Sequence, residues 1–183
     1  MIIVLTGLHG SGKSYFANNI CKKYGFEIIY KNDLIKEMCE KMNINSWHEW
    51  YIENFNKDFI TTTIKILQNL PKDKDIILDS IHSYDEWMVA KKYLKDVYLA
   101  LIIAPENIRK KRYEKDDFLK DIKRINYYHN KENNNINCLY VCATWAFNGI
   151  ASDEINEKSF LELLNYIDSN KTKENKLERK KKL

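Results

Sequence analysis

The chain has 183 residues, of which 44% are hydrophobic and 31% charged, as expected for one ordinary globular domain rather than a fibrous or disordered chain. No apolar run reaches the about 20 residues that a membrane-spanning helix needs. The first apolar run has no basic stretch before it and leads straight into glycines, which argues against a signal peptide. These features predict a cytoplasmic protein with no membrane contact.

The formal net charge of +4 is concentrated at the C-terminal end. Residues 171–183 hold seven basic and two acidic side chains, which leaves 23 basic and 24 acidic ones in residues 1–170. We therefore predict a nearly neutral domain over residues 1–170 and a flexible basic tail over 171–183. A solvated tail is favoured over a tail that binds nucleic acid.

Four cysteines lack the spacing of a zinc site, and buried thiols in a reducing compartment are the favoured interpretation. They are Cys21, Cys39, Cys138 and Cys142.

Along the chain, apolar runs alternate with helical patterns. Residues 1–6 and 26–30 are predicted strands, separated by a helix over 14–24 that Gly25 ends. Asp33 is placed to cap a helix over 34–42, and residues 46–70 are predicted to be mostly helical up to Pro71.

The second half continues the alternation. A strand over 76–78 ends at Asp79 and is followed by a helix over 84–94, a strand over 97–104 and a helix that Pro105 opens. After a polar break at 115–117, a charged helix is predicted to about residue 131, and a last amphipathic helix covers 158–168. Residues 138–149 fit either a strand or a buried irregular segment.

This order of elements predicts an α/β protein with a three-layer P-loop NTPase fold. We expect a parallel sheet of about five strands with helices on both faces, because strands joined through helices pair in parallel. Ligands of such sheets bind beyond the carboxyl ends of the strands.

Residues 7–14 (GLHGSGKS) match the phosphate-binding pattern G-x-x-x-x-G-K-[ST], between a strand and a helix as the pattern requires. In such loops successive backbone N–H groups surround the phosphates of ATP, and the lysine places a positive charge on them. The predicted nucleotide-binding residues are Leu8, His9, Gly10, Ser11, Gly12, Lys13, Ser14 and Tyr15.

Two oxygen-bearing side chains are predicted to hold Mg²⁺. Ser14 offers a hydroxyl at the end of the loop, and Asp79 offers a carboxylate at a strand end, as the Walker B acid does. The alternative for Asp79 is to cap the helix over 84–94, but Ser83 is better placed for that.

The predicted catalytic cations are three arginines that follow the fourth strand, Arg109, Arg112 and Arg124. Lysine is the common cation of this chain, so three grouped arginines favour a role at the transferring phosphoryl group. Asp33 is the candidate proton acceptor for an attacking hydroxyl, with simple helix capping as the equal alternative.

With these residues placed, the chain resembles the nucleotide kinases of the P-loop class, and most closely dephospho-coenzyme A kinase and its small relatives. The resemblance lies in the phosphate loop, in Pro105-Glu106 followed by Arg109 and Arg112, and in the pair Arg124-Ile125. It implies ATP-dependent phosphoryl transfer to a small nucleotide-like acceptor, an acceptor-side segment at 46–70 and a lid over about 109–131.

The acceptor side departs from the adenylate type of this class. Where that type has Asp-Gly-x-x-Arg, this chain has Asp79-Ser80-Ile81-His82-Ser83, so His82 is the candidate for a weaker cation at the substrate phosphate, and the acceptor-site arginine is replaced by Lys36. The resemblance thus assigns substrate contacts to Asp33, Lys36 and His82. The aromatic side chains of residues 46–70 could stack a base, although burial against the sheet is favoured.

Two alternatives stay open. The run from Lys31 to Lys36 also resembles that of 5′-hydroxyl polynucleotide kinases, which is the first alternative. The second is a regulator that binds nucleotide without turnover, because such a protein would not need the arginines that are missing on the acceptor side. Oligomeric state and the preference for ATP or GTP do not follow from the sequence.

Overall fold

The structure is a computed structural model that describes residues 1–112 and 136–181, with side chains at all of these except 136–137 and 174–181. The predicted charged helix before residue 131, and with it Arg124, lies outside the described residues.

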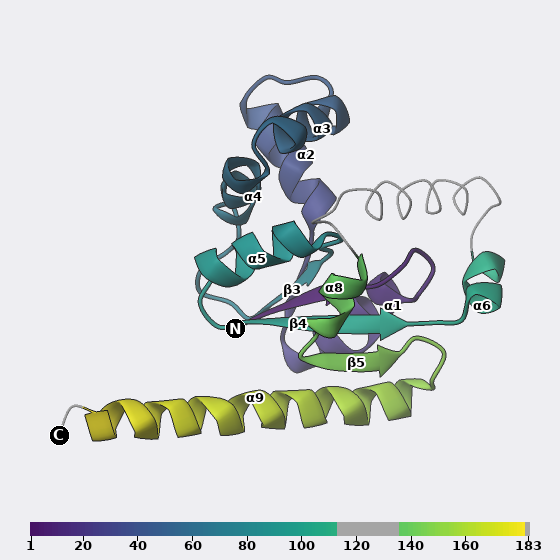
Figure 1. Ribbon diagram of the computed structural model, residues 1–183. Helices are drawn as coiled ribbons and strands as arrows, with labels where there is room; N and C mark the ends of the chain where they lie inside the picture. The colour runs from purple at the N-terminus through teal and green to yellow at the C-terminus, as the bar shows by residue number, and fades with distance from the viewer. Residues whose placement is uncertain (113–135, 182–183) are drawn as a thin grey trace.

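Five parallel strands form a single sheet in the order β2-β3-β1-β4-β5 (Figure 1). The predicted α/β fold and the parallel sheet of about five strands are therefore confirmed. The strand bounds are β1 (Ile2–Thr6), β2 (Glu27–Tyr30), β3 (Ile76–Asp79), β4 (Val97–Ile103) and β5 (Trp145–Asn148).

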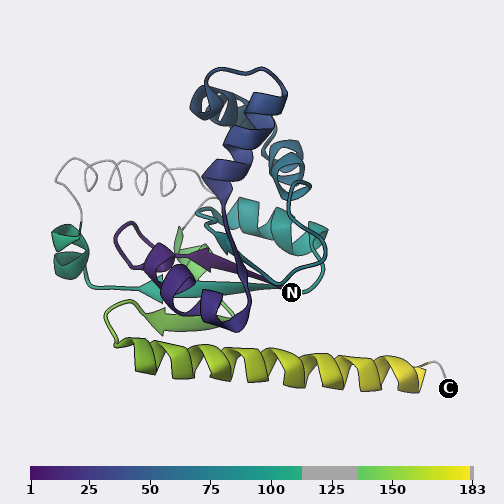
Figure 2. The ribbon, with the colours of Figure 1, turned by 180° about the vertical axis from the view of Figure 1, so that it is seen from behind.

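Helices connect these strands and cover both faces of the sheet, as Figures 1 and 2 show from opposite sides. Their bounds are α1 (Lys13–Asn19), the 3₁₀ helix η1 (Cys21–Tyr24), α2 (Lys31–Lys41), α3 (Trp47–Lys57), α4 (Phe59–Leu67), α5 (Tyr84–Tyr93), α6 (Glu106–Lys111), α8 (Ile136–Val141) and α9 (Asp153–Lys181).

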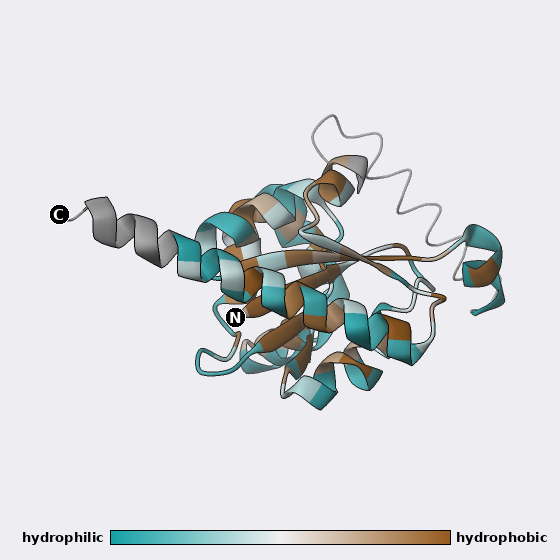
Figure 3. Ribbon diagram, turned by 90° about the horizontal axis from the view of Figure 1, so that it is seen from below, coloured by the Kyte–Doolittle hydropathy of each residue, from teal (hydrophilic) through white to brown (hydrophobic). Residues whose placement is uncertain are grey.

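Alternation along β1 divides the core into two clusters. Ile3 and Leu5 point to one face and pack with residues of α1 and α9, whereas Val4 points to the other face and packs with residues of α2, α4 and α5. Seen from below, α9 carries hydrophobic residues between hydrophilic ones (Figure 3), and its Phe160 is fully buried against the sheet. Both faces of the sheet are thus covered and shielded from solvent, as its continuous apolar strands require.

Several helix boundaries differ from the predicted ones. The first helix gives way to η1 after Ile20, and Gly25 ends it in the left-handed conformation with φ of 83°. The second begins at Lys31, so Asp33 lies inside its first turn and does not cap it. The segment 46–70 contains two helices, because Asp58 interrupts the pattern and its carboxylate accepts a hydrogen bond from the Thr61 N–H at 3.0 Å.

The C-terminal third also differs. The segment 138–149, for which either a strand or a buried irregular segment was predicted, contains the end of α8 and the strand β5. The last helix begins at Asp153 rather than at 158, and it continues as α9 through residues assigned to the basic tail (Figure 1).

The cysteines follow the burial prediction only in part. Cys21 and Cys39 are buried, and burial raises the pKa of the Cys21 thiol. Cys138 is exposed and Cys142 half-buried, so burial is wrong for Cys138. Among the helices of the described ranges, none combines the length and apolarity needed to span a bilayer.

Candidate nucleotide-binding and acceptor site

The phosphate loop lies between β1 and α1 and turns in ways that favour glycine. Gly7, Gly10 and Gly12 have φ angles of 139°, 72° and 102°. A side chain at Gly7 would place its Cβ 2.3 Å from the carbonyl oxygen of Ile102. The three glycines therefore allow a tight loop whose N–H groups line a cradle before the first helix.

Lys13 reaches back over this loop. Its Nζ donates hydrogen bonds to the carbonyl oxygens of Gly7 at 2.9 Å and Leu8 at 3.1 Å. Inside the loop, the Ser11 side chain is buried, and its hydroxyl finds no hydrogen-bond partner within the described part of the chain. An ammonium group held at a glycine-rich loop before a helix suits a polyphosphate.

Ser14 and Asp79 meet although 65 residues separate them. The Ser14 hydroxyl donates a hydrogen bond to Oδ2 of Asp79 at 2.7 Å. The register of β1 against β3, which pairs Leu5 with Asp79, brings the two together. Both carry the oxygen ligands that Mg²⁺ prefers.

The donor set suits Mg²⁺ for a second reason. Among the described residues there is no group of three His, Cys, Asp or Glu side chains that could hold a metal ion. Mg²⁺ in nucleotide sites needs only one or two protein oxygens, because phosphates and water supply the others. The predicted pair Ser14 and Asp79 therefore fits this ion.

Two of the predicted arginines donate hydrogen bonds to carbonyl groups of the phosphate loop. Arg109 is buried, and its Nη1 donates to the His9 carbonyl at 3.1 Å. Arg112 donates from Nη1 to the Gly10 carbonyl at 3.0 Å and from Nη2 to the Gly149 carbonyl at 2.8 Å. In this conformation both side chains position the loop, and their role at a transferring phosphoryl group stays a prediction.

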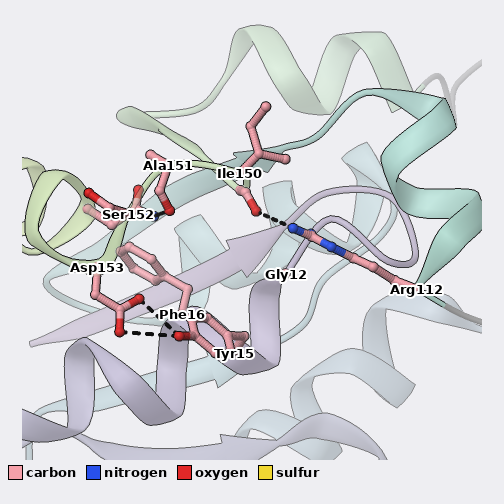
Figure 4. A pocket seen from close by; sticks show the side chains of 10 residues that line it. Gly12, Tyr15, Phe16, Arg112, Ile150, Ala151, Ser152 and Asp153 are labelled. Atoms are coloured by element: carbon pink, nitrogen blue, oxygen red, sulfur yellow. Dashed lines mark hydrogen bonds between the residues drawn. The ribbon is translucent and has the colours of Figure 1, made fainter.

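A cavity of about 720 Å³ opens beside the loop (Figure 4). On one side, the Tyr15 hydroxyl donates to both carboxylate oxygens of Asp153, at 3.1 and 3.2 Å. This hydrogen bond and the negative charge of Asp153 raise the pKa of the Tyr15 hydroxyl, so it remains a donor at neutral pH. The lining residues are Gly12, Tyr15, Phe16, Arg112, Gly149, Ile150, Ala151, Ser152, Asp153 and Asn156.

This cavity adjoins the phosphate loop through Gly12. Of its lining residues, only Gly12 and Tyr15 were predicted to bind the nucleotide, and Arg112 was predicted to be catalytic. Residues 149–156 were not predicted as a binding segment.

Gly149 allows the closest approach to the loop. A Cβ there would lie 1.9 Å from the carbonyl oxygen of Ser11 and 3.1 Å from that of Ile103. We expect Gly149→Ala to displace the loop and to weaken ATP binding at least about tenfold, the effect of 1.4 kcal/mol. Calorimetric titration with ATP measures this.

Gly25→Ala is the matched control. Gly25 has a left-handed φ of 83°, which strains any other residue there, but a Cβ at this position meets nothing within 4 Å. The control should lose about 1 kcal/mol of stability and keep its affinity for ATP. Equal affinities for ATP in the two variants would contradict the assignment of Gly149.

A second pocket of about 320 Å³, here the acceptor pocket, lies between the start of α2, helix α3 and the segment after β3. At its base, Lys31 forms an ion pair with Glu86 at 2.8 Å, and both side chains are nearly inaccessible, with 9% and 3% exposed. Lys31 also donates to the Tyr51 hydroxyl at 3.3 Å. The lining residues are Lys31, Asn32, Trp47, His48, Tyr51, Ile52, Phe55, Asn56 and His82.

Of the three predicted substrate contacts, only His82 lines this pocket, where its Nε2 lies 2.7 Å from the Ser80 hydroxyl. Asp33 and Lys36 form an exposed ion pair at 3.0 Å beside it. Lys36 lies 5.7 Å from the ring centroid of Trp47, which does line the pocket. The role of Lys31 was not predicted, since nothing near it in the chain indicates its partner Glu86.

The aromatic residues of α3 are half-buried, and no residue of this helix is fully buried. The favoured prediction of burial is therefore confirmed only in part: Trp47 and Tyr51 pack on the core, but both also line the acceptor pocket.

Solved structures of small kinases share this fold. A gluconokinase from Sinorhizobium meliloti 1021 aligns with a TM-score of 0.59 at 13% identity, over 94% of this chain and 95% of that one. A shikimate kinase from Acinetobacter baumannii in complex with shikimate aligns with a TM-score of 0.56 at 15% identity, over 93% and 94%. An APS kinase from Mycobacterium tuberculosis in complex with AMPPNP and APS gives 0.52 at 14%, over 90% and 96%.

At the level of sequence, a candidate adenylate kinase from Sulfurisphaera tokodaii is 27% identical over 82 residues. That stretch is 45% of this chain and spans about two fifths (41%) of the relative. A family model described as an AAA domain matches residues 3–138, which begin at β1 and include the phosphate loop, Asp79 and the acceptor pocket. With the greater part of its length matched in this way, the chain belongs to the AAA domain family.

Proposed function

We propose that this protein is a small kinase that transfers the γ-phosphoryl group of ATP to a hydroxyl group of a small acceptor. The observation that carries the proposal is the hydrogen bond from Ser14 to Asp79 at 2.7 Å, next to the lysine of the phosphate loop. It joins the two side chains that suit Mg²⁺ at the carboxyl edge of a parallel sheet, where ligands of such folds bind.

The arrangement assigns a role to each part of the chain. The loop and Lys13 would bind the β- and γ-phosphates, and the cavity beside Tyr15 would receive the nucleoside. Ser14 and Asp79 would hold Mg²⁺, which neutralises phosphate charge when it is bound. The acceptor pocket would hold the second substrate.

In the proposed reaction, an acceptor oxygen forms a bond to the γ-phosphorus as the bond from that phosphorus to the β–γ bridging oxygen breaks. ADP leaves, and the hydroxyl proton passes to the carboxylate of Asp33, which lies one residue after the pocket residue Asn32. Lys13, Arg109, Arg112 and Arg124 are the cations proposed to stabilise the charge that develops.

Proteins of similar fold support two ligands on this scaffold, since one structure holds a nucleotide analogue together with APS and another holds shikimate. The resemblance to nucleotide kinases makes nucleosides, nucleotides and dephospho-coenzyme A the first acceptors to test. A 5′-hydroxyl end of an oligonucleotide is a second candidate, favoured by the aromatic wall of the acceptor pocket, which could stack a terminal base.

The experiment is transfer of label from γ-labelled ATP to a panel of these acceptors, with Asp79→Asn as the variant. We expect Asp79→Asn to lower Mg²⁺-dependent transfer about 10²-fold, because it removes the charge of a metal ligand. Asp73→Asn, at an exposed position, is the control and should leave the rate unchanged. If ATP binds and no acceptor is labelled, a regulator without turnover replaces the kinase.

A further inference from the structure

The acceptor pocket is small. Its volume of about 320 Å³ lies at the lower end of the range for pockets that bind small molecules, about 300–1,000 Å³. A ligand of nucleoside size fills such a space.

One wall of the acceptor pocket is aromatic. The rings of Tyr51 and Phe55 lie with their centroids 5.3 Å apart and their planes tilted by 39°, and Trp47 stands one helical turn before Tyr51. All three rings are half-buried, so each packs on the protein and still borders the cavity. The Nζ of Lys31 lies over the Tyr51 ring, 5.2 Å from its centroid, and also donates to its hydroxyl, so both contacts hold the ring in place. Held rings of this kind favour a planar, apolar-faced ligand.

The lysine that lines the acceptor pocket is neutralised by a carboxylate of the protein itself. Its one permanent cation, Lys31, is paired with Glu86 at 2.8 Å, and the Glu86 side chain is 3% exposed. No arginine stands among the lining residues that the structure describes, and both described arginines next to the site bond carbonyl groups of the phosphate loop. Among the described lining residues, a phosphate or carboxylate on the acceptor would therefore meet no permanent cation other than the paired Lys31.

Two amide side chains also border the acceptor pocket. The amides of Asn32 and Asn56 line the pocket, and an amide both donates and accepts hydrogen bonds. Amide groups match the mixed donor and acceptor edge of a heterocyclic base and do not select for charge.

We infer that the acceptor is an uncharged, planar-ring alcohol of nucleoside size, and that Tyr51 stacks on its ring. The inference rests on the proposed kinase function and narrows its acceptor to nucleosides in preference to nucleoside monophosphates. The acceptor hydroxyl is the group phosphorylated, by the bond changes given above.

The test compares adenosine, cytidine and thymidine with their 5′-monophosphates as acceptors, with ATP and Mg²⁺ as the donor. We expect kcat/KM for at least one nucleoside to exceed that of its monophosphate about tenfold or more. Tyr51→Ala should raise the KM for that nucleoside about tenfold, as loss of a stacked ring does. Tyr51→Phe, which keeps the ring, should stay within about threefold.

Tyr93→Ala is the matched control, because Tyr93 is an exposed tyrosine on α5 away from the acceptor pocket. It should leave KM unchanged, and all three variants should bind ATP with the wild-type Kd. If Tyr51→Ala fails to fold by circular dichroism, Phe55→Ala takes its place with the same expected rise in KM.

Each other outcome has a definite meaning. Preferred transfer to a monophosphate, to shikimate or to gluconate would overturn the inference and leave the kinase proposal standing. Phosphorylation of a 5′-hydroxyl oligonucleotide, with free nucleosides inert, would overturn it in favour of polynucleotide kinase activity. Binding of ATP with no acceptor labelled would overturn the kinase proposal, and the inference with it.

Discussion

Replacing Lys13 by alanine is expected to lower the rate of phosphoryl transfer by about 10²- to 10³-fold, the usual cost of removing one charged group aimed at a transition state. The Nζ of Lys13 lies over the phosphate loop, bonded to the Gly7 and Leu8 carbonyls at 2.9 and 3.1 Å. Bound phosphates would offer this ammonium group a stronger, charged partner. Steady-state transfer from labelled ATP measures the effect, and kcat should fall more than KM rises.

Lys22→Ala is the matched control, since Lys22 is an exposed lysine of η1 outside the nucleotide cavity. It should keep the wild-type rate. Thermal unfolding of both variants separates a catalytic loss from a structural one, because Lys13→Ala also removes two hydrogen bonds to the loop. A Lys13→Ala protein that is folded and transfers phosphate at the wild-type rate would refute the assignment of the donor site.

The fold could be predicted from the sequence because its signals are local. Each of the first four strands is a short apolar run, and Gly7, Gly25 and Pro105 mark turns or helix ends that the structure confirms. The residues at which the helices begin and end were less predictable. The helical pattern continues through Asp58, and only the hydrogen bond of its side chain to the Thr61 N–H shows that a new helix begins there.

The two halves of the candidate site also differ in how local their sequence signals are. The phosphate loop is one continuous motif, and Asp79 follows from the order of strands, so both were predicted. The acceptor pocket depends on contacts across the chain, such as the pair of Lys31 with Glu86, which are 55 residues apart. The approach of Gly149 to Ser11 joins residues that lie even farther apart in the sequence. No spacing rule identifies such pairs before the helices are packed.

Removing one partner of the buried ion pair is expected to have the largest effect on stability. We expect Glu86→Ala to lower the free energy of unfolding by about 3–5 kcal/mol, because Lys31 would keep its charge in a site where only 9% of its side chain is exposed. For a chain of this length that loss corresponds to a fall in Tm of roughly 10 °C. Urea and thermal unfolding measure it.

The exposed Glu37 on the neighbouring helix α2 is the control, and Glu37→Ala should stay within about 0.5 kcal/mol of the wild type. A double variant, Lys31→Met with Glu86→Leu, should recover most of the lost stability, since an apolar pair of similar volume needs no charge balance. The KM of this double variant for the acceptor should nevertheless be higher than that of the wild type, because Tyr51 loses both the hydrogen bond from Lys31 and the cation over its ring. A loss below about 1 kcal/mol in Glu86→Ala would show that water reaches Lys31, and the charge balance that favours an uncharged acceptor would no longer hold.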